Sequence, residues 1–446
     1  MRRFLNVALE NHFEGAPVLG DENISMEEEA IMLDESSQAA AETAQDLSEA
    51  ERIVEVSDAL EDLAVVAGSK DELTPQEAQL LETAGDMAVA GTDVDPDEIV
   101  PSMESFKDAN GKILGSIVME SFREKAKSLW EAILRILKDI WNKIEAFFYK
   151  IFGTIPRRRK QLAALKDKAE HASGLQRKEA KFSVAVNRYM VTGGAPIKTV
   201  EGYQKALGDV VKTAEWVYGP YVDSLGKKGD KIASALEDFN VDNPAESTDK
   251  LRAELPATAH APGAVSHRSS RWEKFSVMKG HDLLGGVSLF SLSLEGKGGE
   301  NTLAVLERER QAQVHLAESQ DKSKDNSSSI DFPTITPVQC ESLIKDLEEL
   351  FEAMEKYQRG KAKGEIEKTR KKIEAASKKA EGASSKAKES EEAAERAAVP
   401  HYRALINFNI AYARWIESPI MGFTKLGFGV ANTTISLIER SLAQYK

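Results

Sequence analysis

The sequence predicts a mainly α-helical protein. We expect an elongated helical body with long amphipathic helices and a small β-hairpin insertion, preceded by an acidic, partly disordered N-terminal segment. Three observations support this expectation. Apolar residues recur every three or four positions over long stretches, the net charge changes sign near residue 104, and a run rich in Val, Ser, Leu and Phe occurs around residues 275–294.

The first 104 residues differ in charge from the rest of the chain. They contain 4 Lys+Arg and 27 Asp+Glu, whereas the remaining residues contain 55 and 46. The net charges are therefore −23 and +9, and the overall net charge of −14 is the sum of these two unlike parts. We call residues 1–104 the leader and residues 105–446 the body. This asymmetry predicts a separate role for the leader, unless it is only a solvated acidic tail.

Within the leader, residues 36–68 predict one or two helices with a thin apolar stripe. The stripe consists of Ile53, Val56, Leu60, Leu63 and Val66, which recur at helical spacing. Residues 91–101 contain two prolines and four acidic residues, so we expect an exposed linker before the body.

Residues 116–152 carry the strongest helical signal of the chain. Their apolar positions are Phe122, Trp130, Ile133, Leu134, Leu137, Ile140, Trp141, Ile144, Phe147, Phe148, Ile151 and Phe152. This pattern predicts a long amphipathic helix, which Gly153 and Pro156 end. Its apolar face would either pack against neighbouring helices, the interpretation we favour, or insert into a membrane interface. A second helix follows, opened by the basic run PRRRK and ending near Gly174.

We divide the body into three parts. Residues 105–255 form an N-terminal helical part, with two helices expected over 176–240, separated by the turn VTGGAP. Residues 256–335 form a loop-rich insertion, in which 272–296 predict a β-hairpin with Gly280, Gly285 and Gly286 near its turn. Residues 336–446 form a C-terminal helical arm and closing helices. Two stretches, 241–271 and 318–332, are predicted as loops.

The C-terminal arm contains a seven-residue repeat of mostly small residues. A capping box with Thr336, Pro337 and Gln339 begins its first helix. The repeat then places Ile366, Ile373, Ala380, Ala387 and Ala394 in one register and Thr369, Ala376, Ala383, Ser390 and Ala397 in the other. Such a seam buries little area, so we expect it to need a partner helix, with residues 114–174 as the candidate. Pro400 ends the repeat.

The sequence offers no positive argument for an enzyme. It has no GxxxxGK[ST] loop, no HExxH and no GxSxG, and its seven histidines are scattered. We therefore predict no cofactor and no metal, and an enzyme is the least supported class. The single cysteine, Cys340, is expected to be a packed thiol. No run of about 18 apolar residues predicts a transmembrane span, and the N-terminus does not match a secretion signal.

The acidic leader, its linker and the stretch MESFREKAKSLWEAILRILKDIWNKIEAFFYKIFGTIPRRRK resemble the internal head, or inner-body, proteins of phiKZ-like giant tailed phages. The resemblance implies a virion structural protein that is packed in the capsid with the genome and is ejected into the host in some cases. It also implies that a prohead protease removes the leader as a propeptide. Expected partners are this protease, the capsid or other internal head proteins, and packaged DNA.

The protease of these phages is expected to cut after Glu when a small residue lies two positions earlier. Ser102, Met103 and Glu104 fit this pattern, with the cut before Ser105. The tetrapeptide MESF occurs twice, beginning at Met103 and at Met119. The second copy departs from the cleavage pattern, because Val118 is not small. The same weak pattern occurs at Ala40-Ala41-Glu42, Ser293-Leu294-Glu295, Ala387-Lys388-Glu389 and Ala393-Ala394-Glu395. The last three lie in the body and would be protected where the chain is folded.

Clustered cations are the candidate DNA contacts. Arg157, Arg158, Arg159 and Lys160 could bind phosphates without reading sequence. We expect the protein in the capsid interior, and in the host cytoplasm during assembly or after ejection. Two alternatives remain open: a prohead scaffold or core protein that leaves the head, and an injected effector that acts on membranes through Trp130, Trp141, Phe147 and Phe148.

Overall fold

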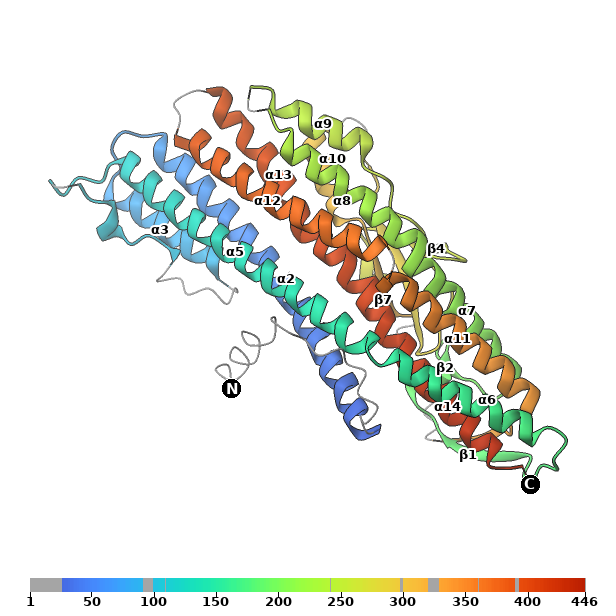
Figure 1. Ribbon diagram of the computed structural model, residues 1–446. Coiled ribbons are helices and arrows are strands. Elements are labelled where there is room, and N and C mark those ends of the chain that lie inside the picture. The colour runs from blue at the N-terminus through green and yellow to red at the C-terminus, as the bar shows by residue number, and fades with distance from the viewer. Residues whose placement is uncertain are drawn as a thin grey trace, which may run out of the picture.

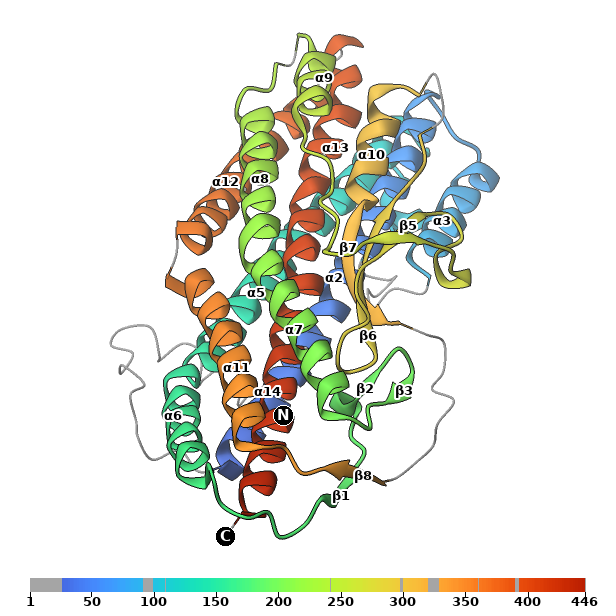
Figure 2. The same ribbon diagram turned by 90° about the vertical axis from the view of Figure 1, so that its right-hand side faces the viewer.

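The computed structural model describes residues 26–90, 99–108, 110–240, 242–296, 300–319, 329–359, 361–389 and 393–445. Long helices follow one long axis, and the strands gather along one side of them (Figure 1 and Figure 2). The element order confirms the mainly α-helical, elongated body with a small β insertion. Residues 1–25 of the leader, and 91–98 of the predicted linker, lie outside the described residues.

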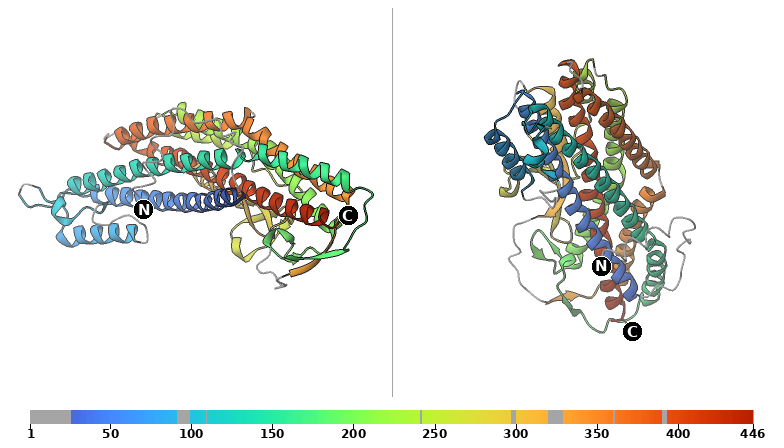
Figure 3. Two further views of the ribbon diagram at one scale, coloured as in Figure 1. Left: turned by 60° about the horizontal axis from the view of Figure 1, so that its bottom comes forward. Right: turned by 90° about the vertical axis from the view of Figure 1, so that its left-hand side faces the viewer.

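The described part of the leader is helical. It contains α2 (Met26–Gly68) and α3 (Pro75–Val89), and the short 3-10 turn η1 (Met103–Phe106) crosses from the leader into the body. A capping box fixes the start of α3, because Thr74 and Glu77 each bond the other's backbone. Figure 3 shows α2, in blue, running along the teal helix α5 of the body, with α3 beside them.

The body begins with α5 (Gly115–Phe152) and α6 (Ile155–Ala172). The helix predicted over 116–152 is confirmed, and so is its break at Gly153. Its apolar stripe is buried at Phe122, Trp130, Ile133, Leu137, Ile140, Trp141, Ile144, Phe147, Phe148, Ile151 and Phe152. The stripe therefore packs in the core, as the favoured interpretation predicted.

Two further long helices are each interrupted by a proline-containing π turn. The first comprises α7 (Val200–Trp216), η3 (Val217–Tyr221) and α8 (Val222–Glu237), and the second comprises α13 (Ala393–Ile416), η5 (Glu417–Met421) and α14 (Gly422–Leu442). Proline lacks an N–H, and a wider turn accommodates the missing hydrogen bond. The two turns lie together, and the Tyr221 hydroxyl donates to the Trp415 carbonyl oxygen at 2.6 Å. The C-terminal segment closes the core as predicted.

The C-terminal arm consists of α11 (Pro337–Arg359) and α12 (Lys361–Glu389). The predicted capping box is present, since the Gln339 side chain accepts from the Thr336 backbone N–H at 3.1 Å and the Thr336 hydroxyl accepts from the Gln339 N–H at 3.3 Å. Cys340 is buried, and burial raises the pKa of its thiol to about 12. This is the packed thiol that the sequence predicted.

The predicted partner of the heptad seam was wrong. The seam of α12 packs on α8 and α13 rather than on residues 114–174. Ile366, Thr369, Ile373 and Ala376 are buried there. The physical reason is Gly229 of α8, where an added Cβ would meet the Thr369 methyl at 2.1 Å, so only glycine permits this close approach. The side chains from 380 to 397 lie outside the described residues.

The predicted hairpin is confirmed and belongs to a larger antiparallel sheet. β5 (Ser276–Lys279) pairs with β6 (Val287–Ser293), with Val277 opposite Leu292. Outer strands β4 (Val265–His267) and β7 (Gln313–Glu318) complete the order β4-β5-β6-β7. The remaining elements are β1 (Lys181–Ala185) paired with β8 (Ser329–Pro333), β2 (Val191–Thr192) paired with β3 (Ala195–Pro196), and the helices α9 (Pro244–Glu254) and α10 (Thr302–Gln311).

Four local predictions need correction. Pro400 lies inside helix α13 instead of ending the arm. Residues 181–185 form strand β1 instead of helix, because Phe182 and Val184 alternate with exposed residues and face the core. Residues 244–254 form helix α9 instead of loop, with Pro244 in the first turn, where its missing N–H does no harm. The predicted polar loop over 318–332 ends in strand β8, and its residues 320–328 lie outside the described residues.

Candidate functional site: the interface between leader and body

The leader helix α2 shares one hydrophobic core with the body. Its fully or nearly fully buried side chains are Leu47, Ala50, Ile53, Val54, Val56, Leu60, Ala64 and Ala67. The predicted stripe is therefore correct at Ile53, Val56 and Leu60, whereas Val66 is 58% exposed. Just beyond the C-terminal end of α2, an added Cβ on Gly115 of α5 would lie 1.9 Å from the Lys70 carbonyl oxygen. The backbone of the leader at residue 70 therefore touches the backbone of α5.

Ion pairs join α2 to body side chains that are themselves largely buried. Arg403 of α13 bonds Asp58 at 3.2 Å and also contacts the carboxylate of Glu61. The side chain of Arg403 is 19% exposed and that of Glu61 is 6% exposed. Burial lowers the pKa of Arg403, and the neighbouring Asp58 carboxylate opposes this shift. The leader thus supplies the negative charge that a buried guanidinium requires.

A second arginine and a lysine repeat this arrangement along α2. Arg414 of α13 contacts the carboxylate of Glu51, and Lys143 of α5 bonds the Asp46 carboxylate at 2.5 Å. Burial lowers the pKa of Arg414, while the nearby Glu417 carboxylate raises it. Burial in turn raises the pKa of Glu417 to about 7, against the effect of Arg414. The charge division predicted a separate role for the leader, but it did not identify these side chains.

The predicted cleavage residues form the exposed turn η1. Glu104 and Ser105 are exposed, whereas Phe106 is fully buried and packs on Phe122 with ring centroids 5.8 Å apart. The Ser105 hydroxyl donates to the Ser102 carbonyl oxygen at 2.6 Å, which holds the turn closed. The side chain of Met103 lies outside the described residues. The bond after Glu104 is therefore accessible, but its backbone is folded rather than extended.

The body directly after this turn is tied back to the leader. The Asp108 carboxylate accepts from the backbone N–H groups of Asn110 and Lys112 at 2.8 Å, which lowers the pKa of Asp108. This loop brings residues 113–115 against residues 71–73. The Leu73 N–H donates to the Ile113 carbonyl oxygen at 2.9 Å. Backbone bonds therefore connect the two sides of the predicted cut.

The four predicted phosphate contacts lie in different environments at the start of α6. Arg158 is buried and donates to the Gln161 side chain at 2.9 Å. Arg159 pairs with Glu355 of α11 at 3.1 Å. Lys160 is exposed and Arg157 is half-buried. The structure therefore does not bring all four cations to one open surface.

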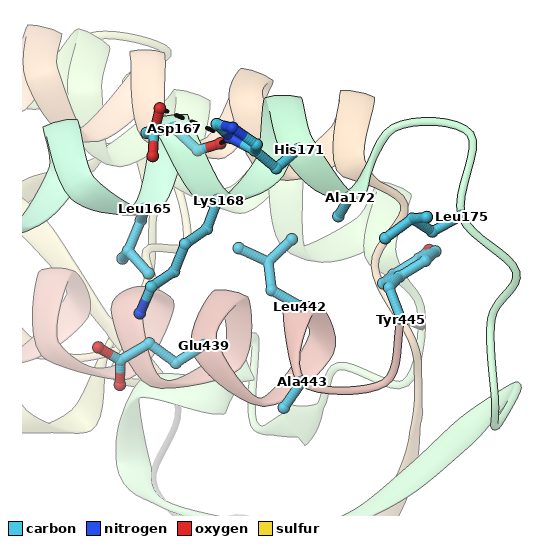
Figure 4. Close-up of a pocket in the computed structure, with 10 residues that line it drawn as sticks. All are labelled: Leu165, Asp167, Lys168, His171, Ala172, Leu175, Glu439, Leu442, Ala443 and Tyr445. Carbon is cyan, nitrogen blue, oxygen red and sulfur yellow. Dashed lines mark hydrogen bonds and ion pairs between the residues drawn. The ribbon is translucent and has the colours of Figure 1, made fainter.

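Figure 4 shows a shallow pocket where α6 meets the end of α14. Its lining includes Asp167, His171 and Glu439. A hydrogen bond from the ring to the Asp167 carbonyl oxygen raises the pKa of His171. Elsewhere, the His315 ring nitrogen lies 2.6 Å from the Ser418 hydroxyl, but burial lowers the pKa of His315 to about 4. That pair has no carboxylate bonded to the ring among the described hydrogen bonds, so it lacks the arrangement of a hydrolase triad.

The described ranges offer neither a metal-binding cluster nor a membrane-spanning helix. No group of three or more His, Cys, Asp or Glu side chains there is placed to bind a metal ion. Among the helices of the same ranges, none combines the length and apolar character needed to cross a bilayer. The interface between leader and body is thus the feature that best connects this structure to a function.

Comparison with known proteins identifies the family. A match to the phiKZ-like phage internal head proteins covers residues 25–440, which includes α2 of the leader as well as almost all of the body. No curated protein and no solved structure shows significant similarity to the chain. The family describes structural proteins of the capsid interior, in agreement with the resemblance found in the sequence. The chain therefore belongs to the phiKZ-like phage internal head proteins.

Proposed function

We propose that this protein is packaged in the capsid together with the genome, after a prohead protease cuts between Glu104 and Ser105. The observation that carries the proposal is the family match over residues 25–440. The charge division at this bond supports it, since −23 lies before the bond and +9 after it. The cut separates a polyanion from a cationic body that tolerates nearby DNA.

The exposed turn at Glu104 supports this choice of bond over the four other matches named above. The matches at 40–42 and 393–395 lie inside the helices α2 and α13, where helical backbone resists proteases, and the match at 387–389 ends at Glu389, the last residue of α12. The match at 293–295 begins in strand β6. Because Phe106 is anchored in the core, the protease must open η1 before it can cut. Phe106→Ala should therefore speed the cut.

Peptide mass mapping of purified virions tests the proposal. We expect the body to begin at Ser105 in mature particles, and a phage carrying Glu104→Gln should keep the uncut chain. Glu120→Gln, in the second MESF, is the matched control and should leave processing unchanged. Virions whose protein still begins at Met1 would contradict the cleavage. Absence of the protein from virions, with presence in proheads, would instead favour the scaffold alternative.

Contact with DNA is a separate part of the proposal. It would be electrostatic and independent of sequence, with Lys160 and the exposed lysines of α12, such as Lys368 and Lys371, as candidate contacts. Binding of the purified protein to duplex DNA should weaken steeply as salt rises. A flat salt response would rule out a substantial role for these cations. Ejection into the host is tested by looking for the protein in infected cells when its synthesis is blocked.

The membrane-active alternative has less support. The aromatic residues Trp130, Trp141, Phe147 and Phe148 are buried in the core. They could reach a membrane only if α5 lost its neighbours. Leakage of lipid vesicles caused by the purified protein would revive this alternative.

A further inference from the structure

We propose that the leader stays bound to the body after their connection is cut, as a separate subunit held on a docking face of α5 and α13. We define the docking face by Ala126, Lys143, Arg403 and Arg414. It fits an acidic amphipathic helix, and α2 is its occupant. The inference rests on the proposed function only for the existence of a natural cut. It implies that cutting and unmasking of the body are two separate events.

The apolar contacts give the first reason. Along its inner face α2 buries Leu47, Ile53, Val54, Val56 and Leu60. The Ser57 hydroxyl donates to the Ala126 carbonyl oxygen of α5 at 3.3 Å within this contact. Departure of α2 would expose these side chains and much of the opposing stripe of α5 to water together. Exposed apolar surface of this extent is unfavourable, so the separated state is disfavoured.

The buried charges give the second reason. Arg403 and Arg414 lie on α13, far beyond the cut in sequence, and their carboxylate partners lie on α2. If α2 left, Arg403 would lose both Asp58 and Glu61. A buried charge that loses its partner is strongly unfavourable unless it becomes hydrated. These two arginines also make the docking face selective, because a neutral or basic helix would not replace the carboxylates that α2 brings to them.

The backbone gives the third reason. Residues 71–73 and 113–115 are bridged on opposite sides of the predicted cut. The Leu73 N–H donates to the Ile113 carbonyl oxygen at 2.9 Å, and the Gly115 N–H donates to the Asp71 carbonyl oxygen at 3.1 Å. An isolated antiparallel bridge joins Glu72 and Leu114. None of these bonds depends on the peptide link at residue 104, so a cut there leaves them in place.

The function of a retained leader follows from the charges that it covers. While α2 is bound, carboxylates of the leader contact Arg403 and Arg414, and the complex of leader and body keeps the net charge of −14 that the uncut chain has. The change to +9 requires dissociation of the leader and not the cut alone. The step that prepares the body for dense DNA would therefore be the loss of α2 from the docking face.

An engineered cut in the full-length protein tests this inference. Residues 92–98 are replaced by a seven-residue recognition sequence for a specific protease, and the purified protein is cut at neutral pH. We expect the leader and the body to elute together from a gel-filtration column, with the mass of one leader plus one body by light scattering. A leader that elutes apart from the body would overturn the inference. Virion mapping tests the natural cut independently, so the two proposals can fail separately.

Matched variants test the role of the buried charges. Glu51→Gln combined with Glu61→Gln should speed dissociation of the cut leader by at least about tenfold, since Arg403 and Arg414 each lose one carboxylate contact to α2. Glu55→Gln combined with Asp62→Asn changes charge equally on the same helix, but both residues are exposed, so the rate should stay within about twofold. Circular dichroism of the uncut variants verifies folding. Equal rates for the two pairs would overturn the charge-selective docking face.

Discussion

The leader helix α2 and the arm helix α12 are both long, highly charged helices with narrow apolar stripes, yet they are attached to the body in different ways. α2 buries large aliphatic residues such as Val56 and Leu60 against α5. It also pairs its carboxylates with buried arginines. α12 instead approaches α8 closely through Thr369 and Gly229, and its lysine Lys372 lies 3.7 Å from an exposed carboxylate.

This difference shows that net charge does not tell how firmly a segment is held. The leader has the more extreme charge, and it could have been a solvated tail. Three of its carboxylates, those of Glu51, Asp58 and Glu61, flank the apolar stripe and face buried cations. In α12 the charges that are described lie mainly on the solvent side. The position of a charge relative to the buried stripe therefore decides its contribution.

The largest effect is expected from removing a buried cation under the leader. Arg403→Met removes the cation that contacts the buried Glu61 carboxylate, so it should lower the free energy of unfolding by about 3–5 kcal/mol. Adding Glu61→Leu removes the stranded carboxylate and should recover most of this loss. Urea denaturation of the full-length protein measures both variants. A double variant as unstable as the single one would contradict the ion-pair explanation.

A pH dependence should come from Glu417, next to Arg414 beneath the leader. The pKa of Glu417 is about 7 in the folded protein, against 4.5 for a solvated Glu side chain in the unfolded chain, because burial disfavours the charged form. The folded state therefore binds this proton more tightly, and stability falls as the pH rises from about 4.5 to 7. Glu417→Gln should remove roughly 2–3 kcal/mol of this decline. The free energy of unfolding of both proteins is measured at pH 5 and at pH 8. An equal decline in the two proteins would refute the assignment to Glu417.

Two glycines at close contacts between elements, Gly115 and Gly229, give the next effect on stability. Gly115→Ala would press a methyl group against backbone oxygens of residues 67 and 70, which cannot rotate away. Gly229→Ala would press on the Thr369 methyl and the Tyr412 ring, whose side chains can shift. We expect the free energy of unfolding to fall by about 3 kcal/mol for Gly115→Ala and by about 1–2 kcal/mol for Gly229→Ala, within the range for overpacking. Gly208→Ala has open space and should stabilise helix α7 slightly, by up to about 1 kcal/mol. Thermal unfolding ranks the three, and a reversed order would contradict this explanation.

The sequence predicted those elements whose signals are local and long. Helix α5 follows from about nine turns of periodic apolar residues, the start of α11 from its Thr336 capping box, and the β5–β6 hairpin from strand-like residues around glycines. Short elements were missed. β1 has only two core residues, Phe182 and Val184, and too few repeats of its pattern to reveal strand rather than helix.

The partners of helices could not be read from the sequence in the same way. The small residues of the α12 seam fit any close neighbour, and only the fold brings Gly229 opposite Thr369. The candidate site was predicted only in part for the same reason. The charge division predicted a separate role for the leader, but Arg403 is more than 300 residues from Glu61, so their pairing depends on the tertiary structure.

The smallest expected effect concerns two partly exposed ion pairs, which we call the outer pairs: Lys143–Asp46, which holds α2, and Lys372–Asp230, which holds α12. Lys143 is about one-third exposed and bonds Asp46 of α2 at 2.5 Å, whereas Lys372 of α12 is more exposed and lies 3.7 Å from Asp230. Lys143→Gln should lower stability by about 0.5–1 kcal/mol, and Lys372→Gln by less than about 0.3 kcal/mol. Raising the salt concentration should shrink the first loss, because the pair is only partly shielded from water. Urea denaturation at low and high salt measures both, with Asp46→Asn added to Lys143→Gln to isolate the coupling. Equal losses at the two lysines would mean that the outer pairs contribute nothing specific to leader attachment, which would then depend on the buried arginines and the apolar stripe alone.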